Sequence, residues 1–159
     1  MKKFTFLIII GILFILIGCA TTQEIRKLPR EEQDKIITRT FEHEYNKVFS
    51  AVIDTLDSIG YTINETNMDA GLIVTDWRYE ETTSKTIIRA AVAGIGRSRA
   101  KVTARIYKKS ENETKVKLTF VLEYYTEFGW MTQNLRNDEE TREVYNKFFT
   151  KIEEYCSQN

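Results

Sequence analysis

The sequence predicts an α+β fold, a two-layer sandwich in which a mainly antiparallel sheet is covered by two helices. Residues 42–59 and 138–155 each carry apolar side chains at three- and four-residue spacing on one side, which is typical of a helix that packs on one face. Residues 100–109 and 115–125 alternate apolar and polar side chains, which indicates strands with one buried face. Two helices with a single apolar stripe each need a sheet to cover, and these strands supply it.

The first half of the domain is predicted to start with a strand over residues 35–41, because β-branched side chains gather there and alternate with polar ones. The helix over residues 42–59 follows, and Gly60 stands where a left-handed C-cap is favoured. Residues 61–65 and 71–79 are predicted to be paired strands joined by a turn rich in Asn, Asp and Gly. Both faces of the second strand are partly apolar, so the pattern does not decide which one faces the core.

The second half contains the least certain segment and the clearest hairpin. Within residues 80–99, residues 86–95 fit either a strand or a short helix, because a short apolar run does not declare its type. Residues 110–114 are predicted to form the turn between the two alternating strands. Residues 126–137 are predicted to be a loop, after which the final helix closes the domain.

The amino-terminal segment precedes this domain and has the pattern of a signal peptide. Lys2 and Lys3 supply a positive start, and residues 4–17 are an almost unbroken apolar run, too short to span a bilayer comfortably. The run ends in Leu-Ile-Gly-Cys, which resembles the lipobox of bacterial lipoproteins. That resemblance implies that the thiol of Cys19 receives a lipid carrying fatty acids such as palmitate, and that the chain is cut before it. The alternative is an ordinary secretory signal with a chance cysteine.

This interpretation divides the chain into three parts. Residues 1–18 are the signal peptide, residues 19–34 are the lipidated cysteine with a polar, flexible tether, and residues 35–159 are a single domain. In lipoproteins a residue such as Ala20 after the cysteine implies delivery to the outer membrane. We therefore expect a protein of the cell envelope, anchored to the membrane by its amino-terminal lipid and facing the periplasm.

Charge and cysteine content narrow the partners. Lys and Arg total 23 and Asp and Glu total 23, so overall charge gives no reason to expect a nucleic-acid ligand. If Cys19 carries lipid, Cys156 has no intramolecular partner, and we expect it to be half-exposed near the end of the last helix. An intermolecular disulfide through Cys156 stays open as an alternative.

No catalytic pattern stands out. His43 is the only histidine, so a catalytic triad or a histidine-rich metal site has no second member, and we interpret it as a surface histidine beside Glu42 and Glu44. The chain has no nucleophile-elbow, phosphate-loop or zinc-ligand spacing. The sequence therefore predicts a protein that is not an enzyme and needs no cofactor or metal.

The most informative charge pattern is a run of cations with no acidic residue between residues 82 and 110. On the strand predicted after Gly94 and Gly96, one face would carry Arg99, Lys101 and Arg105, with Arg97 just before them. Such a stripe fits docking to anionic lipid headgroups or to an acidic partner. Alternatively, Glu65, Glu80, Glu123 and the acidic starts of the helices neutralise it in the fold. The cations of the run are Lys85, Arg89, Arg97, Arg99, Lys101, Arg105, Lys108 and Lys109.

A second candidate contact is the apolar group Phe128, Trp130 and Met131 in the predicted loop. Trp and Met are enriched at interfaces, so Trp130 fits an exposed anchor. It fits equally well a side chain that folds back over the open end of the sheet.

The order of elements adds a resemblance of pattern. A helix, a hairpin whose second strand starts at Gly71, a basic strand, a long strand and a closing helix are similar to the helix-grip domains of the third lipoprotein of the outer-membrane β-barrel assembly machinery. The resemblance spans about residues 41–155 and implies a non-catalytic accessory lipoprotein. The preferred function is a binding or scaffolding module of the cell envelope, in outer-membrane assembly or maintenance. The alternative is a carrier that holds a lipid or another apolar ligand between helix and sheet.

Overall fold

Two long strands form the centre of the sheet. The structure, a computed structural model, describes residues 29–80, 97–133 and 139–158. Strand β5 (Ser98–Lys108) and strand β6 (Thr114–Thr126) pair antiparallel along the whole length of β5. This is the hairpin that the alternating pattern predicts.

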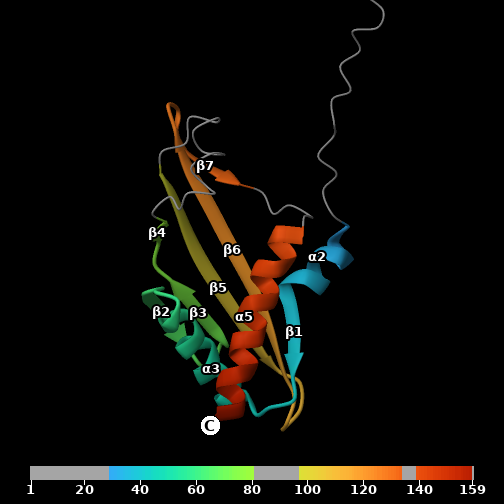
Figure 1. The fold of residues 1–159 in the computed structure, drawn as a ribbon. Coiled ribbons are helices and arrows are strands. Elements are labelled where there is room, and N and C mark those ends of the chain that lie inside the picture. The colour runs from blue at the N-terminus through green and yellow to red at the C-terminus, as the bar shows by residue number, and fades with distance from the viewer. Residues whose placement is uncertain (1–28, 81–96, 134–138, 159) are drawn as a thin grey trace, which may run out of the picture.

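Around this hairpin the chain adds shorter strands and three helices in its described part. These elements are α2 (Arg30–Ile37), β1 (Thr38–Phe41), α3 (Tyr45–Ser58), β2 (Ile63–Asn67), β3 (Leu72–Thr75), β4 (Arg78–Glu80), β7 (Gly129–Gln133) and α5 (Glu139–Gln158). The sheet has the order β1-β6-β5-β3-β2, with β4 also on β5 and β7 also on β6 (Figure 1). Every pairing among these strands is antiparallel.

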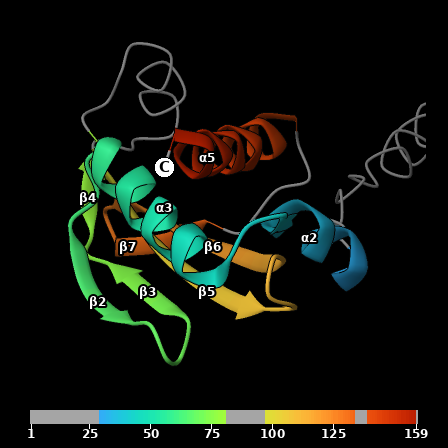
Figure 2. The same cartoon turned by 90° about the horizontal axis from the view of Figure 1, so that it is seen from below.

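Helices α3 and α5 lie together on one face of the sheet (Figure 2), so the predicted two-layer α+β sandwich is confirmed. Their apolar stripes meet the buried faces of β5 and β6, where burial of apolar surface is the main stabilising contribution. The core between the layers consists of Phe41, Val48, Phe49, Ala51, Val52, Leu56, Tyr61, Ile73, Ala100, Val102, Ala104, Ile106, Val116, Leu118, Tyr145, Phe149, Ile152 and Cys156.

The amino end of the domain departs from the prediction. Residues 30–34, predicted as tether, and residues 35–37, predicted as the start of a strand, together form α2. Two glutamates in the first turn suit the positive end of the helix dipole. Ile36 and Ile37 pack against the core from this helix, so their apolar character serves a helix end and not an alternating strand. Strand β1 is correspondingly short.

The predicted strand over residues 71–79 is divided into β3 and β4. The hydroxyl of Thr75 accepts a hydrogen bond from the backbone N–H of Val102 at 2.9 Å, so a side chain replaces the next bond of the β3–β5 ladder. The carboxylate of Asp76 accepts one from the backbone N–H of Trp77 at 2.7 Å, which turns the chain before β4. Ile73 and Thr75 are fully buried on the helix side, which settles the face that the sequence left open.

The predicted loop over residues 126–137 is also partly wrong, because residues 129–133 form strand β7 and pair with the end of β6. The two strands extend as a hairpin beyond the helices at one end of the molecule (Figure 1). The ambiguous residues 86–95 and the whole segment through residue 28 lie outside the described residues.

Candidate functional site

The two faces of the central strands differ in what they meet. On β5, Val102, Ala104 and Ile106 are buried beneath the helices, and the intervening side chains lie on the opposite face. Helices α3 and α5 leave that opposite face uncovered (Figure 2). We call it the open face. Its members on β5 and β6 are Arg99, Lys101, Thr103, Arg105, Tyr107, Lys115, Lys117, Thr119, Val121, Glu123 and Tyr125.

Arg99 is the centre of an aromatic cluster at one end of the open face. Its guanidinium carbon lies 4.2 Å from the ring centre of Trp77 and 4.1 Å from that of Trp130, so the cation is held between two indoles. Glu123, directly opposite on β6, accepts a hydrogen bond from Nε of Arg99 at 2.8 Å and an ion-pair contact from Nη2 at 2.6 Å. An indole face attracts a cation, and the carboxylate neutralises its charge. The contacts of Arg99 therefore join the end of β5 to β6, to β7 and to the residue just before β4.

The electrostatics of Arg99 follow from the same contacts. Partial burial acts to lower the pKa of its guanidinium, but hydrogen bonds with Glu123 and Tyr79 outweigh burial and raise that pKa. The two side chains of the ion pair are 20% and 16% exposed, which makes it a partly buried pair. Arg99 is therefore a permanently charged group with its charge already balanced.

Two cations of the open face have an acidic partner: Arg99 of the predicted basic stripe, and Lys117, which lies outside that stripe. Arg99 is neutralised by Glu123, one of the acidic residues expected to do so, and Lys117 pairs with Asp34 of α2 at 2.8 Å. The charge of Lys117 and its hydrogen bond lower the pKa of the Asp34 carboxyl. Lys101, which is half-buried, follows Arg99 along β5, and Arg105, which is exposed, lies directly opposite Lys117. Within the described part of the chain, neither has an ion-pair partner.

Arg97 is exposed just before β5, where its carbonyl accepts a hydrogen bond from the backbone N–H of Tyr125 at 2.9 Å. Lys85 and Arg89 of the basic run lie outside the described residues. Glu65 on β2 is an acidic neighbour of the open face, one strand removed, because it pairs with Val74 of β3. Lys101 and Arg105 are therefore the two β5 cations of the open face that have no ion-pair partner among the described residues.

The structure separates the side chains of the apolar group. Trp130 lies on the open face against Arg99 and Tyr125, with the two ring centres of Trp130 and Tyr125 5.3 Å apart. It folds over the end of the sheet, as one of its two interpretations has it. Phe128, in the turn between β6 and β7, is 87% exposed, and Met131 on the other side of β7 is 46% exposed.

His43 and Cys156 occupy places that the sequence pattern did not give them. Nε2 of His43 lies 2.9 Å from a carboxylate oxygen of Glu153 on α5, an acidic partner distant in the sequence. The prediction of a half-exposed Cys156 is wrong, because α5 continues past it and its side chain is fully buried. Burial raises the pKa of the Cys156 thiol to about 11. Among the described residues, no three His, Cys, Asp or Glu side chains are grouped to hold a metal ion.

The space between helices and sheet is filled by core side chains such as Val48, Val52 and Leu118, none more than 1% exposed. Two shallow hollows of the described surface lie along the outer side of α5, lined by residues such as Thr150 and Glu154. One of them is also lined by Arg39 of β1, and the other is lined by residues of α5. Cys19 lies outside the described residues, and of the helices that are described none has the length and apolarity needed to cross a bilayer.

Sequence reasoning missed the aromatic partners of Arg99, namely Trp77, Tyr79 and Trp130, and it did not place Glu123 directly opposite Arg99. The alternation of β5 and β6 places Arg99 and Glu123 on one face. The sequence does not fix the register between β5 and β6. A turn over residues 110–114 would pair Arg99 with Tyr125, two positions from its observed partner Glu123. A turn one residue earlier gives the observed register.

The fold is that of an α+β sandwich, and comparisons with known proteins add little to it. No family model matches the sequence, and no curated protein matches it. The adenylate sensor from AMP-activated protein kinase is 11% identical, with a TM-score of 0.43, over 72% of this chain and 93% of that chain.

Two bacterial structures are similar to the same degree. A DUF4468 family protein from Bacteroides ovatus is 9% identical, with a TM-score of 0.42, over 75% of this chain and 84% of that one. A TBP-like protein from Parabacteroides distasonis is 12% identical, with a TM-score of 0.41, over 76% of this chain and 90% of that one. These likenesses concern the fold alone.

Proposed function

We propose that this chain is a non-catalytic, lipid-anchored module of the cell envelope that binds an acidic protein partner on its open face. The amino-terminal pattern ending at Cys19 supports the lipid anchor. In this proposal the anchor lies in the outer membrane and the domain faces the periplasm. The resemblance to helix-grip domains supports an accessory role in outer-membrane assembly or maintenance.

One observation carries the binding surface. Five cations lie on the open face of β5 and β6. Arg99 and Lys117 are balanced by Glu123 and Asp34, and Lys115 lies over the ring of Tyr107. Lys101 and Arg105 have no ion-pair partner within the described residues. A partner's carboxylates would complete the pattern. Complementary charge of this kind speeds association and selects against wrong partners more than it adds affinity.

The carrier alternative needs a lined cavity between helix and sheet. The filled core gives that alternative no support in the described part of the chain. An open sheet face with charged side chains near its middle fits a protein partner better than an apolar small molecule.

The test is chemical cross-linking in native cells with the full chain. We expect a cross-linked envelope protein that is lost in the double variant Lys101→Gln/Arg105→Gln. The matched control Lys47→Gln/Lys151→Gln removes the same charge from the helices α3 and α5. Equal loss in both double variants, or retention of the product in the first, contradicts the proposed surface.

A further inference from the structure

The turn that joins β6 and β7 is held in one conformation by its own hydrogen bonds. The hydroxyl of Thr126 donates to the carbonyl of Gly129 at 3.0 Å and accepts from the backbone N–H of Phe128 at 3.2 Å. Gly129 has a φ of 103°, a backbone conformation that residues with a side chain rarely adopt. The turn therefore presents the Phe128 ring to solvent, where it is 87% exposed.

Other aromatic side chains surround this tip. Tyr125 is 48% exposed, Tyr79 is 64% exposed, and both have their rings against Trp130. Tyr and Trp combine an apolar ring with a polar atom, and they are enriched where protein meets the headgroup layer of a membrane. Exposed apolar side chains gathered at one projecting point indicate a contact surface.

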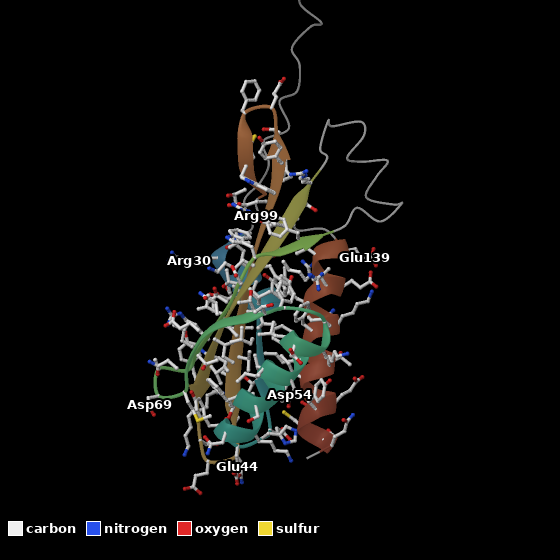
Figure 3. The ribbon with its side chains drawn as sticks, turned by 90° about the vertical axis from the view of Figure 1, so that its left-hand side faces the viewer. Arg30, Glu44, Asp54, Asp69, Arg99 and Glu139 are labelled. Carbon is white, nitrogen blue, oxygen red and sulfur yellow. The ribbon has the colours of Figure 1, made fainter. Side chains whose placement is uncertain are left out.

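The position of α2 places this tip within reach of the anchored segment. In Figure 3, Arg30 lies nearer the Arg99 end of the molecule than Glu44 does, so the chain leaves α2 from the hairpin half. From Lys117, which holds α2 through Asp34, to Thr126 is nine residues of β6, about 30 Å. The ten residues from Cys19 to Pro29 reach up to about 35 Å when extended.

We propose that the β6–β7 tip docks into the interfacial layer of the same membrane that holds the amino-terminal segment, with the Phe128 ring inserted. This rests on the anchor of the proposed function. The exposed Glu127 and Arg97 stay in the headgroup layer, and the anchor and the tip give the domain two points of attachment. The open face then stands to the side, turned toward a partner and away from the lipid.

A bilayer fits the tip better than a second protein does. The short tether holds the domain beside the membrane, whereas nothing in the described residues forms a pocket around Phe128 that a partner would extend. The opposite end of the sheet offers a comparison, because the β2–β3 turn beside Asp69 (Figure 3) also carries an exposed apolar side chain, Met68, at 44%.

The experiment uses the full chain in vesicles of phosphatidylethanolamine and phosphatidylglycerol. In a Trp77→Phe background Trp130 is the remaining tryptophan. Its emission is compared between ordinary vesicles and vesicles whose acyl chains are brominated near the headgroup. We expect brominated lipid to quench Trp130, Phe128→Ser to abolish that quenching, and Met68→Ser to leave it unchanged.

Each outcome decides one proposal. Flotation with the vesicles tests the anchor, and a chain that does not float contradicts the anchor on which both proposals rest. A chain that floats but shows no quenching of Trp130, or equal quenching in the Phe128→Ser variant, overturns the tip insertion. Quenching of this kind is independent of Lys101 and Arg105, so loss of the protein partner in the cross-linking test leaves it intact.

Discussion

Gly71, directly before β3, is the position where one methyl group should cost the fold most. Its φ is 62°, and a Cβ placed there would lie 2.0 Å from the carbonyl oxygen of Ile106 on β5. The Gly71 carbonyl also accepts a hydrogen bond from the N–H of Ile106 at 2.8 Å. Gly71→Ala must therefore push β3 away from β5 at the point where the two strands are joined.

The magnitude follows from two contributions. The left-handed conformation costs about 1–2 kcal/mol for an alanine, and loss of the strained backbone hydrogen bond adds about 1 kcal/mol, before any repacking of β3. We expect Gly71→Ala to lower the free energy of unfolding by about 2–3 kcal/mol, and by more if β3 has to repack. Gly60→Ala is the control, because Gly60 has a φ of 81° but no atom within 4 Å of the added Cβ. It should lose only the conformational part, about 1–2 kcal/mol.

Urea unfolding followed by circular dichroism measures both variants, with the slope checked for two-state behaviour. Gly71→Asn is a further variant, because Asn tolerates the left-handed conformation and keeps the clash. Equal losses for Gly71→Ala and Gly60→Ala, or full recovery in Gly71→Asn, would refute the close approach of β3 to β5.

Three further results are expected. Glu123→Gln leaves the Arg99 cation between two indoles without its counter-charge, so we expect a loss of about 1–3 kcal/mol in urea unfolding, and wild-type stability in this variant would argue against the cluster. Burial raises the pKa of the Cys156 thiol to about 11, so a thiol reagent should modify it at neutral pH only as fast as the chain unfolds; rapid labelling of the native chain, located by mass spectrometry, would contradict its burial. The pKa of Asp34 is lowered by Lys117, so its carboxyl should titrate below the ordinary range by NMR and return to it in Lys117→Met. Because that pKa is lowered in the folded state, its contribution to stability is present at neutral pH and is lost as the pH falls through the folded-state pKa.

The sequence predicts the layers and the faces of this fold well, because they depend on periodicity alone. Alternation along β5 and β6 separates Val102 from Lys101 whatever the exact register is, since a shift of two residues keeps every side chain on its own face. The stripes of α3 and α5 likewise need no knowledge of their partners.

Contacts across the sheet could not be predicted in the same way. Whether Arg99 meets Glu123 or Tyr125 depends on where the turn after β5 is centred, and the polar residues at 110–114 allow either centre. The pairing of β7 with β6 depends on partners that lie apart from any local pattern. The local sequence pattern therefore predicts a loop at Trp130, although Trp130 lies in β7 and its ring packs against the Arg99 guanidinium.

The beginning of the domain shows a competition between local patterns. Ile36 and Ile37 are apolar and β-branched, which suggests a strand, but they complete a helix that the preceding polar residues begin. Cys156 read as half-exposed from its place near the chain's end, but burial depends on where α5 packs and not on distance along the chain.

We propose that the open face around Lys101 and Arg105 meets a protein of the cell envelope. A photoreactive amino acid at Thr103, between these two cations on the same face, tests it most directly in living cells. We predict a cross-link to one envelope protein from position 103 that disappears in Lys101→Gln/Arg105→Gln, and no such product from Asp54 on the outer side of α3. The same product from both positions, or none from position 103, would contradict the claim.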